Sequence, residues 1–273
     1  MAATTVTQRP GFTGDAGMLA RRLFGPALLA GLLGGLTMIV VMILVMGAAG
    51  MGYATPLNLG MAAFVFTIIP PMSMLPSLMG LMGIHLPPSA AGPLMAAVRS
   101  SHISPMMMHK LGAMLTGMHV PAATVSQMGL LMSGKATNST TASLMSTMSP
   151  SARAMVMNAM PVSAGHVVAG TILHFAFAGF LGMAFAAVIG AAAWARIPGM
   201  RSPAGIMSAG VIGGAIVYVI MRWGLLPPVN PLMAFVPQIA FFLAHLLFGL
   251  VAGIVLAVAF HRPRVAGALP PSR

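Results

Sequence analysis

The stretch QIAFFLAHLLFGLVAGIVLAVAF, residues 238–260, decides the fold class of this chain. It contains no charged side chain, and a helix needs about 20 apolar residues to cross the hydrocarbon core of a bilayer. Three more stretches have the same character, at residues 24–50, 167–195 and 204–221. The sequence therefore predicts an all-α integral membrane protein built on a four-helix transmembrane bundle.

The composition supports a bilayer as the solvent of this protein. Of its 273 residues, 58% are hydrophobic and only 5% are charged, whereas soluble domains carry about 25% charged residues. Thirteen Lys and Arg face a single acidic residue, Asp15, which gives a net charge of +12. The cations are scattered and form no basic patch interleaved with aromatic residues. We therefore expect anionic lipid headgroups, and no nucleic acid, as the counter-charge.

The distribution of the cations predicts the orientation. Cytoplasmic segments of membrane proteins are enriched in Lys and Arg. We expect the tails at 1–23 and 261–273 and the short connection at 196–202 to be cytoplasmic in a multi-pass protein of the plasma membrane. Trp194 and Trp223 are expected to anchor the helices at the two membrane interfaces. This assignment leaves five cations on the other side of the membrane. Eight of the thirteen lie on the cytoplasmic side: Arg9, Arg21, Arg22, Arg196, Arg201, Arg262, Arg264 and Arg273.

Residues 51–165 separate the first span from the three-helix region at 166–260, and they are rich in Met, Pro, Ser and Thr. Two parts, 62–84 and 111–134, are apolar enough to raise the span count from four to six. Pro70, Pro71 and Pro76 interrupt the first, which argues against a straight crossing helix. We expect four spans and an extracytoplasmic insert of amphipathic helices that lie along the membrane. Its most polar part, KATNSTTAS at 135–143, is expected to be an exposed loop.

The insert contains a methionine cluster, PMMMHKLGAMLTGMH at residues 105–119. Thioether and imidazole groups are the ligands that Cu(I) prefers, so one hypothesis is a copper site on the outer side of the membrane. Its candidate ligands are Met106, Met107, Met108, His109, Met114, Met118 and His119.

Packing gives a second interpretation of the cluster, and it is the one we favour. On a helix at about 100° per residue, the methionines from Met107 to Met118 share an arc of about 120° with Leu111 and Leu115. His109 lies on the other side. Leucine cannot bind copper, so a face that it shares with methionine is explained by packing.

Two histidines lie well inside predicted spans, His174 and His245. Ionisable residues in a membrane are candidates for function, and two histidines on neighbouring helices could ligate a haem from both faces. The alternative is that each imidazole forms a hydrogen bond to a facing helix.

Every predicted span also contains small residues four positions apart, a spacing that lets helices approach closely in lipid. These pairs predict a compact bundle and offer faces for a homo-oligomer. They are Ala27 with Gly31 and Gly35, Ala186 with Gly190, Gly210 with Gly214, and Gly249 with Gly253.

Several activities are excluded by residue type. The chain has no cysteine, which removes disulfides and thiolate chemistry, and one aspartate cannot support catalysis by paired carboxylates. Nucleotide-binding loops and zinc-protease motifs are also missing from the sequence. We expect a non-catalytic accessory or assembly protein that contacts lipid or a membrane protein partner and needs no cofactor. The alternative function is metal handling, with copper at the insert or haem between the spans.

Overall fold

The protein is described by a computed structural model that covers residues 13–53, 55–56, 66–99, 103–160 and 163–261. These residues form helices and connecting turns, with no strand among them. The predicted all-α class is therefore confirmed.

The four helices predicted to cross a membrane are all present and are long and apolar enough to do so. The third continues past its predicted end through a π-helical turn and a short last helix. The elements are α1 (Thr13–Ala48), α8 (Ala164–Trp194), α9 (Pro203–Val219) with the π turn Ile220–Leu225 and α10 (Leu226–Val229), and α11 (Gln238–His261).

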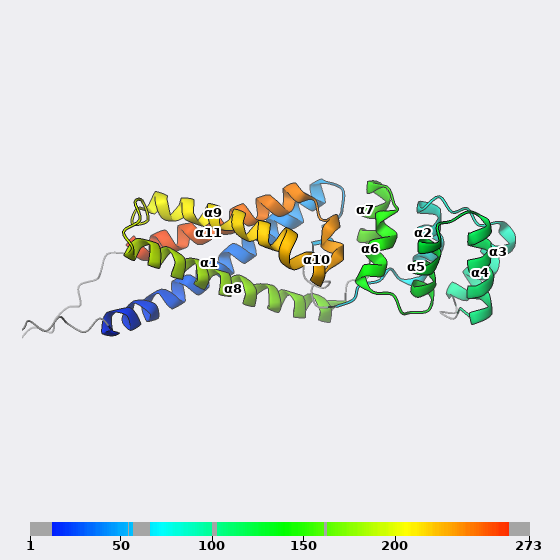
Figure 1. The fold of residues 1–273 in the computed structure, drawn as a ribbon, viewed down its shortest axis with the longest axis horizontal. Helices are drawn as coiled ribbons and strands as arrows, with labels where there is room; N and C mark the ends of the chain where they lie inside the picture. The colour runs from blue at the N-terminus through cyan, green and yellow to red at the C-terminus, as the bar shows by residue number, and fades with distance from the viewer. Residues whose placement is uncertain (1–12, 54, 57–65, 100–102, 161–162, 262–273) are drawn as a thin grey trace, which may run out of the picture.

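Helix α11 occupies the middle of the bundle, where it packs along α9 on one side and α1 on the other, while α1 also packs along α8. Helices α8 and α9 touch little, so the bundle is less tightly closed on that side. The start of α1 and the end of α11 lie at one end of the bundle, and the insert lies at the other (Figure 1). The two ends of the described chain are therefore on the same side of the bundle.

Glycine makes these helix contacts close. A methyl group added at Gly210 would overlap the backbone of Gly249, and one added at Gly31 would overlap the backbone of Ala178. These small-residue faces are thus occupied within the chain, so an oligomer would need another surface. Gly190 differs, because an added methyl there meets no atom within 4 Å.

The insert forms short helices, and none in its described residues is long enough to cross a membrane. The described part of 62–84 and residues 111–134 fall in these short helices and the turns beside them, so the described residues hold four spans and not six. The elements of the insert are the 3₁₀ turn Met72–Met74, α2 (Leu75–Leu81), α3 (Pro88–Arg99), α4 (Pro105–Gly117), α5 (Ala122–Met132), α6 (Asn138–Ser146) and α7 (Pro150–Ala159).

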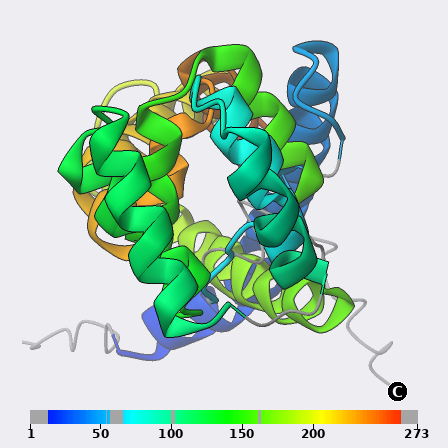
Figure 2. The ribbon, with the colours of Figure 1, turned by 90° about the vertical axis from the view of Figure 1, so that its right-hand side faces the viewer.

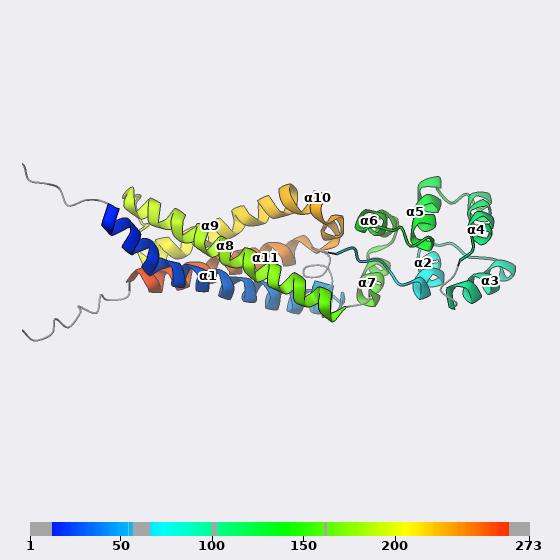
Figure 3. The same ribbon diagram turned by 90° about the horizontal axis from the view of Figure 1, so that it is seen from below.

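The insert helices stack outward along the long axis of the molecule. Helices α6 and α7 lie next to the bundle, and α3 and α4 lie farthest from it (Figure 1, Figure 3). Figure 2 looks onto this stack from its outer end. A second 3₁₀ turn, Pro231–Phe235 between α10 and α11, contacts α6 and joins insert to bundle. The sequence led us to expect helices along the membrane, whereas only the α6–α7 layer borders the bundle.

A continuous apolar core runs from the insert into the adjoining end of the bundle, and methionine supplies much of it. Methionine has three rotatable bonds and fills irregular gaps between short helices. The buried methionines are Met42, Met46, Met79, Met128, Met132, Met145, Met148, Met157, Met160 and Met233.

The exposed loop expected at 135–143 is wrong from residue 138 onward, since only residues 135–137 lie outside a helix. Helix α6 begins there, because Thr137 and Thr140 form a reciprocal capping box in which each side chain bonds the other residue's backbone N–H. Asn138 then holds the preceding chain, since its side-chain amide donates to the Phe66 carbonyl at 3.1 Å and its oxygen accepts from the Ile68 N–H at 2.8 Å. Threonine and asparagine, which resemble loop residues in sequence, act here as caps.

Candidate functional site

Helix α4 and the turn that follows it carry the predicted copper ligands, and those on the helix do not share one face. Leu111 and Leu115 are buried, with Met108 and Met114 packed partly against the same core. On the opposite side, His109 is exposed. The helix begins at Ser104, whose hydroxyl accepts from the Met107 N–H at 3.2 Å, ahead of Pro105 in the first turn. The predicted amphipathic helix is confirmed.

His119 ends this helix through its backbone. It has a φ of 61°, and the next residue, Val120, donates its N–H to the Leu115 carbonyl at 3.0 Å. Together with the bond from the His119 N–H to Thr116, this is the Schellman arrangement that terminates many helices. His119 and Met118 are exposed, and copper binding at α4 stays a prediction.

A groove of about 360 Å³ lies between α3 and α4 at the outer end of the insert. Three of the predicted copper ligands, Met106, Met107 and Met114, line it from α4, and no predicted histidine does. Lys110 is the one charged residue of its lining. The remaining lining residues are Ser89, Ala90, Pro93, Leu94, Ser104 and Leu111.

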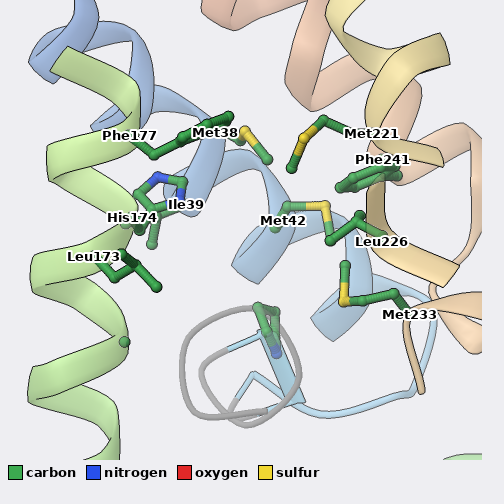
Figure 4. Close-up of a pocket in the computed structure, with 12 residues that line it drawn as sticks. Met38, Ile39, Met42, Leu173, His174, Phe177, Met221, Leu226, Met233 and Phe241 are labelled. Carbon is green, nitrogen blue, oxygen red and sulfur yellow. The ribbon is translucent and has the colours of Figure 1, made fainter. Parts of the chain in front are cut away.

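A second cavity, of about 110 Å³, lies in the half of the bundle nearest the insert. Its walls come from α1, α8, the π turn, α10, the second 3₁₀ turn and α11, and they are almost entirely apolar. Four methionine side chains reach into it from opposite sides (Figure 4). They are Met38 and Met42 on α1, Met221 in the π turn, and Met233 in the 3₁₀ turn.

His174 and His245 line one smaller cavity of about 40 Å³ that shares walls with the first. Met38 and Met221 line it as well. The cavity thus receives one donor side chain from each of α1, α8 and α11, and one from the π turn that extends α9.

Each of the two imidazoles is fixed by a backbone carbonyl. His174 donates its Nε2–H to the Gly35 carbonyl on α1 at 3.2 Å. His245 donates its Nδ1–H to the Phe241 carbonyl, one turn earlier on α11, at 2.7 Å. A carbonyl oxygen only accepts, so the nitrogen bonded to it carries the proton. In the neutral imidazole the other ring nitrogen then has a free lone pair.

The bond from His174 to α1 is the kind that our alternative to haem predicted, whereas His245 bonds its own helix and not a facing one. A cavity of about 40 Å³ is far smaller than a porphyrin, which would have to separate the helices to enter. Haem binding at His174 and His245 stays a prediction.

The four methionines that line the larger cavity were not predicted from the sequence as members of a site. Met38 and Met42 stand four positions apart on α1, but Met221 and Met233 lie in the π turn and the 3₁₀ turn, whose backbone paths no helical spacing predicts. A search for methionines four apart within one span would have found Met38, Met42 and Met46 on α1, but neither Met221 nor Met233.

The bundle carries an outer surface of large apolar side chains, as lipid contact requires. Exposed examples on the four spans are Leu33, Leu44, Ile172, Val188, Ile212, Ile216, Ile239 and Val258. The chain is therefore a polytopic membrane protein. Comparisons of the chain with protein-family models, with curated proteins and with solved structures give no match.

Proposed function

We propose that this protein is a non-catalytic accessory or assembly factor of the plasma membrane that holds a helix of a partner protein in the α3–α4 groove. The observation that carries the proposal is the groove itself, about 360 Å³ in volume and lined by Met106, Met107 and Met114. Methionine-rich grooves suit helical ligands, because the flexible thioether side chains adapt to the apolar face that enters.

The position of the groove supports this role. It lies in the outermost layer of the insert (Figure 1), where a partner can reach it without competing with lipid around the bundle. Lys110 stands in the lining and is exposed. We therefore expect an amphipathic partner helix with an acidic residue beside its apolar face.

The orientation belongs to the same proposal. The start of α1, the end of α11 and the connection between α8 and α9 lie at one end of the bundle (Figure 1), and that connection holds Arg196 and Arg201. We propose that this end is cytoplasmic and faces anionic headgroups, which places the groove on the extracytoplasmic side.

Site-specific photo-cross-linking in intact membranes tests the proposed groove. A benzophenone side chain at Met106, which is 69% exposed, should give one discrete protein adduct. The same group at Met155 on α7, which is 57% exposed and outside the groove lining, is the matched control and should give none. Ala90→Trp fills the groove from α3 and should remove the Met106 adduct.

Three results would contradict the proposal. They are no adduct at Met106, equal adducts at Met106 and Met155, or a Met106 adduct that Ala90→Trp leaves unchanged.

A further inference from the structure

The small cavity in the middle of the bundle has the donors, the orientation and the size of a site for a soft metal ion. Its wall contains the imidazoles of His174 and His245 and the thioethers of Met38 and Met221. We propose that these four side chains bind one Cu(I) ion. This site is independent of the α3–α4 groove and of the copper ligands predicted on α4.

The first argument is convergence. The four side chains come from four different stretches of the chain, and they meet only because the bundle is assembled. His174 is followed by Phe177 in the wall on α8, and the rest of the lining is apolar. In this lining, donor groups are therefore concentrated on the two histidines and two methionines.

The second argument is the orientation of the imidazoles. Histidines that ligate metals nearly always donate their other ring N–H to a carboxylate, a carbonyl or water, which fixes the ring and its tautomer. Both histidines do this with backbone carbonyls, His174 with Gly35 and His245 with Phe241. Nδ1 of His174 and Nε2 of His245 are left as the nitrogens that can ligate.

The third argument is the backbone at Met221. This residue lies in the π turn Ile220–Leu225, where α9 departs from regular α geometry. Single π turns inside helices occur frequently at functional sites. Met221 also keeps helical register with Val217, four positions earlier on α9, and both residues line the small cavity.

The charge selects the ion. All four donors are neutral, and the chain has one acidic residue, Asp15, so the ion's charge is not cancelled by its ligands. The cost of an ion in an apolar interior rises with the square of its charge, and Arg222, next to Met221, adds a further positive charge. A monovalent ion that prefers thioether and imidazole ligands is favoured over any divalent ion, and Cu(I) has that preference.

The neighbouring cavity supplies a path to this site. It shares Met38, His174 and Met221 with the small cavity, and it adds Met42 and Met233 on the side of the insert. Thioethers exchange Cu(I) readily among themselves because each is a weak, neutral ligand. The geometry therefore connects the proposed site to the insert end of the bundle.

The test is a Cu(I) titration of the full-length protein in lipid nanodiscs, without oxygen and against a chromogenic Cu(I) chelator. We expect one Cu(I) per chain, with both nitrogen and sulfur neighbours in its X-ray absorption spectrum. Met38→Leu with Met221→Leu keeps the side-chain volume nearly constant, which cores tolerate. It should weaken binding at least about tenfold and remove the sulfur neighbours.

Two control variants make the assignment specific. Met106→Leu, Met107→Leu and Met108→Leu together remove thioethers from α4 and should leave the affinity for Cu(I) unchanged. His174→Asn should weaken binding and lower the nitrogen count, provided that its elution and thermal unfolding match those of the wild type.

The proposal is overturned if the wild type binds no Cu(I). It is also overturned if the Met38 and Met221 double variant keeps its affinity and sulfur neighbours, or if only the α4 variant loses binding.

Discussion

Asn138 shows how one side chain can close a connection between distant parts of this chain. It stands at the start of α6, yet both ends of its amide bond the backbone seventy residues earlier, at Phe66 and Ile68. Thr141, one turn later, adds a bond to the Ile68 carbonyl. The segment that leads into α2 is thus fastened to the layer of the insert nearest the bundle.

Asn138→Ala should lower the free energy of unfolding of the insert by about 1–3 kcal/mol, because it leaves two backbone groups without their partner. Ser139→Ala is the matched control, since Ser139 is the exposed neighbour on the same helix. Limited proteolysis and thermal unfolding in detergent measure both variants. An equal loss of stability at the two positions would show that the Asn138 hydrogen bonds do not stabilise the insert.

The same residue also bears on modification. Asn138-Ser139-Thr140 fits a glycosylation sequon in sequence, but the amide nitrogen that would carry the sugar donates to Phe66. A glycan on Asn138 would therefore break the fastening that the prediction tests.

At the scale of elements, glycine determines which helices pack together. Gly210 and Gly214 on α9 face Gly249 on α11 at backbone contact, and α11 turns its other side to α1. In lipid no hydrophobic force drives helices together, so close backbone approach supplies the association.

Gly210→Ala and Gly249→Ala should each destabilise the bundle by about 1–3 kcal/mol through overpacking. Gly190→Ala should be neutral or slightly stabilising, because a methyl group there meets open space and alanine is the better helix former. Unfolding by SDS in mixed micelles measures all three. A loss at Gly190 as large as that at Gly210 would contradict this account.

The sequence predicts these elements unevenly, for physical reasons. The spans follow from hydropathy alone, and the caps Ser149 before α7 and Ser202 before α9 follow from their position ahead of a proline. Helical spacing in the sequence puts Ala152, Met155, Val156 and Ala159 of α7 on one face, which we expect to be buried. Ala152 and Val156 are buried as expected, but Met155 is exposed and Met157 is buried in its place. The elements that pack against a short helix determine which of its faces is buried, and the spacing of its apolar residues does not reveal them.

The site was predicted in part. His174 and His245 were identified because histidine is conspicuous in an apolar helix, and they do line one cavity. Met38 and Met221 were not, because methionine in a span resembles any other apolar residue until the fold brings its sulfur beside an imidazole.

At the scale of the whole molecule, the protein is a bundle with a helical stack on one end and with the start of α1 and the end of α11 on the other (Figure 3). Trp194, 74% exposed at the end of α8, and Trp223, 61% exposed in the π turn, mark the two ends. Tryptophan is enriched where membrane meets water on both sides. These positions agree with a bundle that crosses the bilayer once per helix.

Cysteine labelling measures the orientation directly, because the chain has no cysteine of its own. Lys135→Cys, exposed between α5 and α6, should react with a membrane-impermeant maleimide on intact cells. Arg201→Cys, exposed between α8 and α9, should react only after permeabilisation. The reverse pattern would invert the proposed orientation, and labelling of both from one side would rule out a complete crossing by α8.

The central place of α11 has a consequence for biosynthesis. Of the four spanning helices it is the last to leave the ribosome, so α1, α8 and α9 enter the membrane before their common neighbour exists. Until then the glycines of α9 and one side of α1 lack the helix against which they pack. The bundle is therefore completed from its centre only after translation has passed residue 261, and a nascent chain stalled before α11 would expose the faces that bind other helices most readily.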